Sequence, residues 1–592
     1  MARTPRKDQA AAAAESIIDE AMGFRMRLRT PLSAWRSLSG FGLLLGTLFF
    51  CAALTPSLLP RSTLSQGVLA GAALAAGYGL GVFARWLWRY MELAEPPERL
   101  RSRVNIIIAI VSATLAAYFL SQVTGWQNSI RSLMGMPPVT SGHLLEVILT
   151  ALATFLILLI LARLYRLVSR FVSRRADRFL PRRVANVIGV VVALTLFWSL
   201  VTDVLVTRAL KVLDASFAQY DALIEPEAAQ PASPLKSGSR ESLLRWDELG
   251  RTGREFIASG PSARDIAAIS GRAAREPIRV YVGLRAAETP EARARLALRE
   301  LLRTGAFERS VLVLVTPTGT GWIDPAAMNS VEYLHHGDVA SAALQYSYLN
   351  SPLSLLVEAE YGADVARALF EEVYDYWREL PTERRPRLYL HGLSLGALHS
   401  QASWELHELI GDPFQGALWS GPPFESQMWR RITDDRNPGS PEWLPQFRDG
   451  RFVRFMNQHG TPEPMDASWG PMRLLYLQYA SDPIVFFDYR YAWRRPDWLS
   501  EPRGPDVTPA LRWFPLVTML QLAVDMAVTT PTPPGHGHVY APADYVDAWR
   551  LVTAPNNWND ETLSRLKAHL TRELASAAEQ DGNEAAYGNR GG

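Results

Sequence analysis

Residues 387–401 read Arg387-Leu-Tyr-Leu-His-Gly-Leu-Ser394-Leu-Gly-Ala-Leu-His-Ser-Gln401 and carry the strongest structural signal in the chain. A short apolar run leads into Gly392-x-Ser394-x-Gly396, and a helical pattern follows through Ile410. A strand, a tight turn that exposes a serine, and a helix form a nucleophile elbow when they occur in this order. Glycine on either side of the serine avoids a collision with the neighbouring backbone. The alternative interpretation is a glycine-rich turn with a surface serine.

Apolar strands alternate with amphipathic helices on both sides of this elbow, from about residue 278 onward. We expect strands at residues 278–282, 310–315, 388–394, 416–419 and 474–478, and helices at residues 290–302, 361–380, 395–410 and from 543. This alternation predicts a mostly parallel sheet covered by helices on both faces. In such sheets, functional groups gather beyond the carboxyl ends of the strands.

Asp482 follows the expected strand 474–478 and is therefore predicted at the same edge of the sheet as Ser394. We expect its carboxylate to be the acidic member of a catalytic triad. Because Asp before Pro commonly caps a turn, a purely structural role is the alternative, and Asp488 is then the reserve candidate.

The candidate bases lie in the loop Gly535-His536-Gly537-His538, just before the last helix. A neutral imidazole accepts the serine proton and returns it to the leaving group. We favour His538, which is nearer the helix, and keep His536 as the second candidate. Two histidines one residue apart also suit a metal ion, but no second cluster of ligands accompanies them, so we expect neither a metal nor a cofactor.

The segment Thr316-Pro-Thr318-Gly319-Thr-Gly-Trp322 follows a predicted core strand upstream of the elbow. Backbone N–H groups at this place supply one half of an oxyanion hole, and the residue after the nucleophile supplies the other. We therefore expect N–H groups near Thr318 and Gly319, together with that of Leu395, to bind an oxyanion. The alternative is a glycine-rich phosphate loop, but no lysine stands in the required place.

The N-terminal third of the chain contains long apolar runs, at residues 38–54, 68–84, 104–120, 144–162 and 184–206. A membrane-spanning helix needs about 20 apolar residues, with about 17 as the lower limit. We therefore expect five spans. Buried helices of a large soluble protein are the alternative, and the charge pattern of the connecting loops argues against it.

Arginines are concentrated in the leader 1–37 and in the loops at residues 85–103 and 163–183, whereas the intervening loops hold little positive charge beyond Arg61 and Arg131. Loops rich in Lys and Arg stay in the cytoplasm. The N-terminus is therefore predicted inside the cell, and five spans place the remainder of the chain outside the cytoplasm.

Composition adds few constraints. The chain has 592 residues with 61 basic and 59 acidic side chains, which indicates no nucleic-acid partner, and its single cysteine excludes an intrachain disulfide. No feature specifies an oligomeric state. The expected domains are a cytoplasmic basic leader (1–37), a transmembrane domain (38–210), a connector (211–277), a catalytic domain (278–575) and a flexible tail (576–592).

Several motifs resemble one known family, a group of bacterial membrane-anchored α/β-hydrolases with an N-terminal multi-span domain. The similar segments are Pro56-Ser-Leu-Leu-Pro-Arg61, Trp246-Asp-Glu-Leu-Gly250, Pro277 to Leu284, Pro317 to Trp322, His391 to Gly396 and Gly535-His-Gly-His538. The resemblance covers about residues 40–555. It implies an α/β-hydrolase fold preceded by an all-α transmembrane bundle, with Ser394, Asp482 and His538 in the chain order of that fold, and it implies no particular substrate.

Together these patterns predict a serine hydrolase of ester or thioester bonds with a lipid-like acyl substrate and membrane lipids as partners. The membrane helices motivate the lipid, as do aromatic residues after the elbow, such as Trp419 and Phe487. Two alternatives stay open: an acyltransferase that uses the same acyl-enzyme, and a non-catalytic lipid-binding or scaffold protein. A transporter is disfavoured because charged residues are nearly absent from the apolar runs.

Overall fold

The computed structural model describes residues 39–95, 97–199, 221, 229–348, 359–462, 467–500, 502–527 and 532–588. The chain divides into two compact units. One contains residues up to 54, 66–123 and 143–160. The other contains the loops 55–65 and 124–142 together with everything from residue 161 onward. The predicted leader 1–37 lies outside the described residues.

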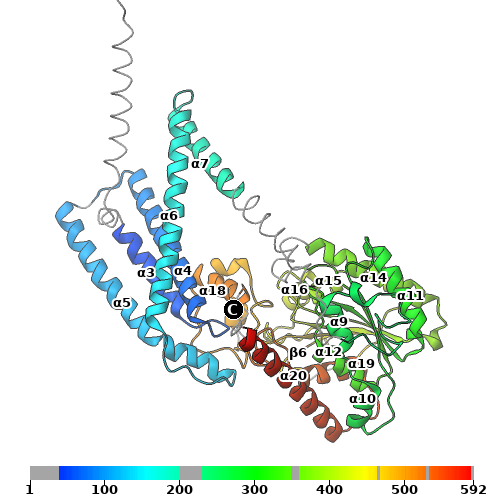
Figure 1. The fold of residues 1–592 in the computed structure, drawn as a ribbon. Helices are drawn as coiled ribbons and strands as arrows, with labels where there is room; N and C mark the ends of the chain where they lie inside the picture. Colours follow the sequence, from blue (N-terminus) through cyan, green and yellow to red (C-terminus); the bar gives the residue numbers. More distant parts are fainter. Residues whose placement is uncertain are drawn as a thin grey trace, which may run out of the picture. The chain divides into compact units, whose positions relative to one another are not determined.

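Five helices make up the apolar N-terminal region: α3 Gly40–Leu54, α4 Thr63–Tyr90, α5 Glu98–Leu133, α6 Leu144–Ala176 and α7 Arg182–Ser199 (Figure 1). Within the described residues, α4 to α7 are long and apolar enough to cross a membrane. Helix α3 is also apolar but has 15 residues, fewer than the roughly 17 that a span requires. The structure therefore supports four of the five expected spans by length, and residues 200–206 of the last one lie outside the described part.

The soluble region is built on a parallel sheet of seven strands in the order β1-β3-β2-β4-β5-β7-β6. The strands are β1 Ile278–Val282, β2 Val311–Thr316, β3 Val339–Leu344, β4 Arg387–Leu393, β5 Gly416–Ser420, β6 Val453–Met456 and β7 Arg473–Leu477. Strand β4, which leads into the elbow, pairs with β2 and β5. The expected mostly parallel sheet is confirmed, and Ser394 follows its central strand.

The burial of the strands explains their composition. Strand β2 reads Val-Leu-Val-Leu-Val-Thr and is buried along nearly its whole length, as expected for a parallel strand with helices on both faces. In β4, Tyr389 and His391 both contact Trp549 of α19 (Pro542–Thr553), so the alternate residues Leu388 and Leu390 face the opposite side.

Two groups of helices cover the sheet (Figure 1). One group contains α11 Pro290–Thr304, α14 Ala359–Glu379 and α15 Leu395–Gln401, and the other contains α12 Pro325–Leu334, α19 and α20 Asp560–Gly588. Within the described residues, the remaining helices are α9 Gly250–Ala258, α10 Ala263–Ser270, α16 Gln427–Asp434, α17 Asp497–Ser500 and α18 Val517–Ala527. Short 3-10 turns are η2 Trp246–Glu248, η3 Ala306–Glu308, η4 Thr382–Arg384, η5 Leu406–Leu409 and η6 Tyr489–Ala492.

The structure differs from the sequence-based assignment in several places, and helices α12, α16 and α18 were not expected. Strands β3 and β6 were not expected, because β3 is rich in alanine and β6 has only four residues. The helix after the elbow ends at Gln401 and not near Ile410. The expected last helix is two helices, α19 and α20. Residues 576–588 are helical and form the end of α20, in keeping with their Ala and Glu content, and the flexibility expected of this tail stays a prediction.

Candidate active site

Ser394 lies in the sharp turn between β4 and α15. Its backbone has φ 56° and ψ −125°, a strained conformation for a residue other than glycine. A Cβ on Gly392 would lie 2.3 Å from the backbone of Gly396, and a Cβ on Gly396 would lie 2.1 Å from the carbonyl oxygen of Thr316. Both glycines are therefore required by close backbone approach, and the elbow predicted from the sequence is present.

Asp482 lies five residues beyond the end of β7 and is completely buried. Its Oδ1 accepts a hydrogen bond from the N–H of Ile484 at 2.9 Å. Its Oδ2 accepts the hydroxyl of Tyr540 at 2.8 Å and lies 2.7 Å from Nδ1 of His538. The carboxylate is thus held at both oxygens, and one of them orients an imidazole.

The contact between His538 Nδ1 and the Asp482 carboxylate determines which ring nitrogen of His538 carries the proton. With a carboxylate at Nδ1, the neutral ring carries its proton on Nδ1 and leaves Nε2 as the acceptor. Nε2 is shielded from solvent and has no hydrogen-bond partner among the described residues. The ring therefore presents a free basic nitrogen.

Ser394 and the His538 ring approach two consecutive residues at the end of β5. The N–H of Ser394 donates to the carbonyl of Ser420 at 2.9 Å, and the next residue, Gly421, lies so close to the ring that a Cβ there would be 2.6 Å from His538 Cε1. No hydrogen bond joins Ser394 to His538, both of which the structure describes. Such contacts are often long in an unliganded site and tighten when substrate binds.

No hydrogen bond or ion pair joins His536 to Asp482, both of which the structure describes. The carbonyl of His536 accepts the hydroxyl of Thr532 at 3.0 Å, and burial lowers the pKa of the His536 ring. Between the two histidines, the N–H of Gly537 donates to Ser481 Oγ at 2.8 Å. The structure therefore pairs Asp482 with His538 and leaves His536 outside that pair.

Asp488, the reserve candidate, lies in a different environment. Its carboxylate accepts hydrogen bonds from Arg490 at 2.6 Å and from Arg430 at 3.1 Å. Burial alone raises the pKa of this carboxyl, but the bonds from Arg490 outweigh burial and the pKa is lowered overall. No histidine is among the partners that the structure gives for Asp488.

The loop after β2 lies directly against the elbow, because Gly396 abuts the carbonyl of Thr316. Leu395 is the first residue of α15, where a backbone N–H has no acceptor within the helix. The N–H of Thr318, however, donates to the carbonyl of Trp322 at 2.9 Å. That group is bonded within its own turn, so Leu395 and Gly319 are the better candidate donors, and the assignment of an oxyanion hole to these three residues stays a prediction.

Two residues near His538 were not identified from the sequence. Tyr540 donates to Asp482, and burial keeps the pKa of its hydroxyl well above the usual range; its place two residues after His538 was a usable signal. Asp324 caps α12 by accepting the N–H of Ala326 at 2.9 Å, and burial raises the pKa of its carboxyl to about 6. The Asp324 carboxylate interacts electrostatically with His538, and no sequence motif indicated Asp324.

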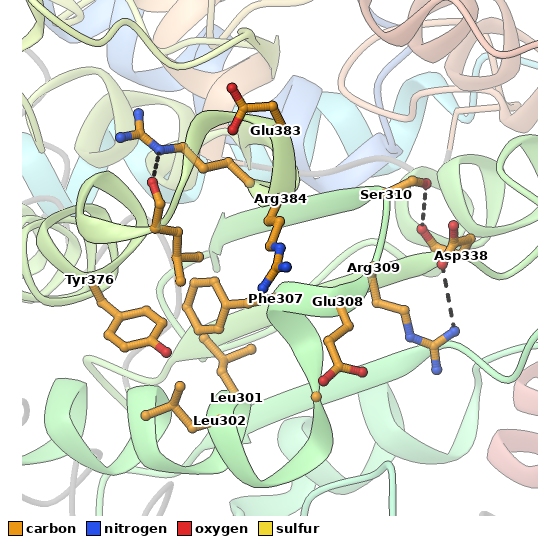
Figure 2. Close-up of a pocket in the computed structure, with 13 residues that line it drawn as sticks. Leu301, Leu302, Phe307, Glu308, Arg309, Ser310, Asp338, Tyr376, Glu383 and Arg384 are labelled. Atoms are coloured by element: carbon orange, nitrogen blue, oxygen red, sulfur yellow. Dashed lines mark hydrogen bonds and ion pairs between the residues drawn. The ribbon is translucent and has the colours of Figure 1, made fainter.

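A cavity of about 640 Å³ lies elsewhere on the sheet (Figure 2). Ser310, Asp338 and Arg385, which precede β2, β3 and β4, line it. Ser310 Oγ donates to the carbonyl of Asp338 at 3.0 Å, and Arg309 forms an ion pair with the Asp338 carboxylate. This cavity is at the amino ends of the strands, roughly 20 Å along β4 from Ser394, so it is not the candidate active site.

A parallel sheet whose central strand ends in an elbow serine, with a carboxylate-bound histidine beyond a later strand, defines the α/β-hydrolase class. Comparison with protein families agrees. Residues 278–566 match a model described as an alpha/beta-hydrolase family, and residues 54–261 match one described as the N-terminus of that family. The chain belongs to this alpha/beta-hydrolase family. Comparisons with curated proteins and with solved structures find no match.

Proposed function

We propose that the protein is a membrane-anchored serine hydrolase that cleaves ester or thioester bonds of a lipid-like acyl substrate. One observation carries the proposal: the Nδ1 of His538 is bound to Asp482 while its Nε2 is buried and free beside the segment that anchors Ser394. A histidine in this state is a base that lacks only its proton donor. The family supports hydrolase chemistry in general.

The proposed reaction has two steps. Ser394 Oγ attacks the substrate carbonyl carbon while His538 Nε2 takes the hydroxyl proton; the bond to the leaving group then breaks, and the imidazolium returns the proton to the departing alcohol or thiol. Water attacks the acyl-enzyme by the same route, releases the carboxylic acid and restores the serine hydroxyl. Asp482 holds the tautomer and stabilises the imidazolium, and the N–H groups of Leu395 and Gly319 bind the oxyanion.

We further propose that the site faces the extracytoplasmic side of a bacterial inner membrane. The loops 55–65 and 124–142 bind directly to the hydrolase part of the chain, so they share its side of the membrane: the N–H of Leu58 donates to Asp525 Oδ2 at 3.2 Å, and Ser129 Oγ lies 3.1 Å from Thr508 Oγ1. These are the connecting loops with little positive charge, which the distribution of arginine assigns to the outside. This argument does not depend on how many helices cross the bilayer. Proximity to the bilayer favours a lipid substrate.

A fluorophosphonate probe tests the nucleophile on the full-length protein in detergent. We expect labelling of the wild type, and we expect Ser394→Ala to abolish it. Ser400→Ala is the matched control, because Ser400 is a buried serine in the helix that follows Ser394, and its Oγ accepts the indole N–H of Trp419. Undiminished labelling of Ser394→Ala would refute the assignment.

The lipid part of the proposal has its own test. For a series of aryl esters of increasing acyl length, we expect kcat/KM of the wild type to rise with chain length and the Ser394→Ala variant to be inactive throughout. Each buried methylene contributes about 0.8 kcal/mol, so a site that binds an acyl chain discriminates strongly along such a series. A preference for acetyl esters contradicts a lipid-like substrate.

A further inference from the structure

The loop that joins α3 to α4, residues 55–62, is part of the same compact unit as the hydrolase sheet and is packed into its core. Leu58 and Leu59 are 1% and 4% exposed and belong to the hydrophobic core that contains the strands. The two residues belong to the Pro-Ser-Leu-Leu-Pro-Arg segment, which is otherwise only a short connection between apolar helices. Such deep burial of a connecting loop is unusual, because loops normally run over the surface.

Asp525 in α18 clamps this loop. Its Oδ2 accepts the backbone N–H groups of Leu58 and Leu59 at 3.2 Å and 3.5 Å, and its Oδ1 accepts Nε of Arg61 at 2.8 Å. The side chains of Arg61 and Asp525 are 3% and 0% exposed, so the ion pair is shielded from water. One helical turn earlier, Gln521 Nε2 donates to the carbonyl of Thr55 at 3.0 Å. The carboxylate thus holds the loop by three donors.

The clamped loop reaches the residue between the two histidines. A Cβ on Gly537 would lie 3.1 Å from Cδ2 of Leu59, which places the leucine against the Gly537 backbone. The backbone N–H of Gly537 also donates a hydrogen bond to Ser481 Oγ, and Ser481 directly precedes Asp482. Gly537 has φ 58°, a conformation that glycine adopts without strain and other residues rarely do. Because Gly537 directly precedes His538, these contacts also constrain the position of the His538 ring.

We infer that Leu59 is a positioning residue for His538: Asp525 fixes the α3–α4 loop, and the Leu59 side chain supports Gly537 so that the imidazole is directed toward Ser394. This inference rests on the proposed hydrolase function. The α3–α4 loop, which belongs to the N-terminal family region, then supports the proposed catalytic site, and a truncated protein that begins at residue 278 lacks this support.

The test compares Leu59→Ala with Leu58→Ala in the full-length protein. The two leucines are adjacent, equally sized and buried, and the Asp525 carboxylate binds both backbone N–H groups, but it is the Leu59 side chain that lies against Gly537. Turnover is expressed per site titrated with fluorophosphonate, which removes the effect of unfolded protein. Because displacement of a catalytic group by about 1 Å costs up to about 100-fold, we expect Leu59→Ala to lower kcat about 10- to 100-fold with little change in KM.

Leu58→Ala is expected to lower thermal stability to a similar extent while its kcat per titrated site stays at the wild-type value. Leu59→Met, which conserves volume, is expected to restore turnover. The inference is overturned if Leu59→Ala keeps the wild-type kcat, or if Leu58→Ala lowers kcat equally. Absence of labelling at Ser394 in the wild type would instead refute the proposed function, and the inference with it, so the two failures are distinguishable.

Discussion

His538 Nδ1 lies 2.7 Å from Asp482 Oδ2, and the same oxygen accepts the hydroxyl of Tyr540 at 2.8 Å. The carboxylate is completely buried and receives a further bond from the N–H of Ile484, so it has no freedom to turn away from the imidazole. This relationship distinguishes His538 from His536 in the Gly-His-Gly-His loop, and it underlies the first prediction.

Asp482→Asn is expected to lower kcat by about 10³- to 10⁴-fold, because an amide at this place favours the wrong imidazole tautomer while geometry is preserved. Asp488→Asn is the matched control, since Asp488 binds arginines and no histidine, and it is expected to keep the wild-type kcat. The measurement is steady-state ester hydrolysis. Equal losses for the two variants would contradict the assignment.

Gly396→Ala is expected to destabilise the protein by about 2 kcal/mol or more and to abolish fluorophosphonate labelling, because its Cβ would lie 2.1 Å from the carbonyl oxygen of Thr316. Gly411→Ala serves as the control, because a Cβ at Gly411 has nothing within 4 Å. Thermal unfolding and probe labelling of both variants check the prediction. A Gly396→Ala protein with wild-type stability would show that the elbow is not closely packed.

Arg61→Met is expected to cost about 3–5 kcal/mol of unfolding free energy, because it leaves the buried carboxylate of Asp525 without its cation. Arg494→Met is the comparison: Arg494 and Asp497 are 59% and 51% exposed, and such pairs contribute about 1 kcal/mol or less. Denaturation of the detergent-solubilised variants measures the difference. Similar small losses for both would mean that water or another group replaces Arg61.

The buried carboxyl of Asp324 predicts a pH dependence of stability. Its folded pKa of about 6 exceeds the unfolded value of about 3.9, so between these values the folded protein binds the extra proton and stability falls as pH rises. Above about pH 6 the full penalty is present. Asp324→Asn, which still caps α12, is expected to flatten the fall and to gain about 1–3 kcal/mol at pH 8. An unchanged slope between pH 4 and 6 would contradict the raised pKa.

Membrane orientation is tested with a membrane-impermeant maleimide on intact cells. The single native cysteine, Cys51, is buried and serves as the silent background. Cysteine placed at the exposed Arg295 on α11 is expected to be labelled from outside. Cysteine placed at the exposed Arg178, in an arginine-rich loop, is expected to react only after permeabilisation. The reverse pattern would place the hydrolase sheet in the cytoplasm.

The sequence by itself determined the features that depend on near neighbours along the chain. The elbow was predictable because Gly392, Ser394 and Gly396 act through local sterics, and the membrane helices because their apolar runs are continuous. The parallel sheet followed from the alternation of buried strands with amphipathic helices. Strand β3 was not predicted, because its alanines have little strand preference of their own and lie in the sheet only through pairing with β1 and β2.

Only the tertiary structure decided between His538 and His536, because the distinction is a contact with Asp482, which lies 56 residues earlier. The same holds for the N–H of Thr318, whose bond to Trp322 depends on how the loop closes. The clamp between Arg61 and Asp525 joins residues 464 apart, and no local pattern encodes such a partnership. Pairings over these separations arise from the packing of the whole unit, which periodicity and motif spacing do not contain.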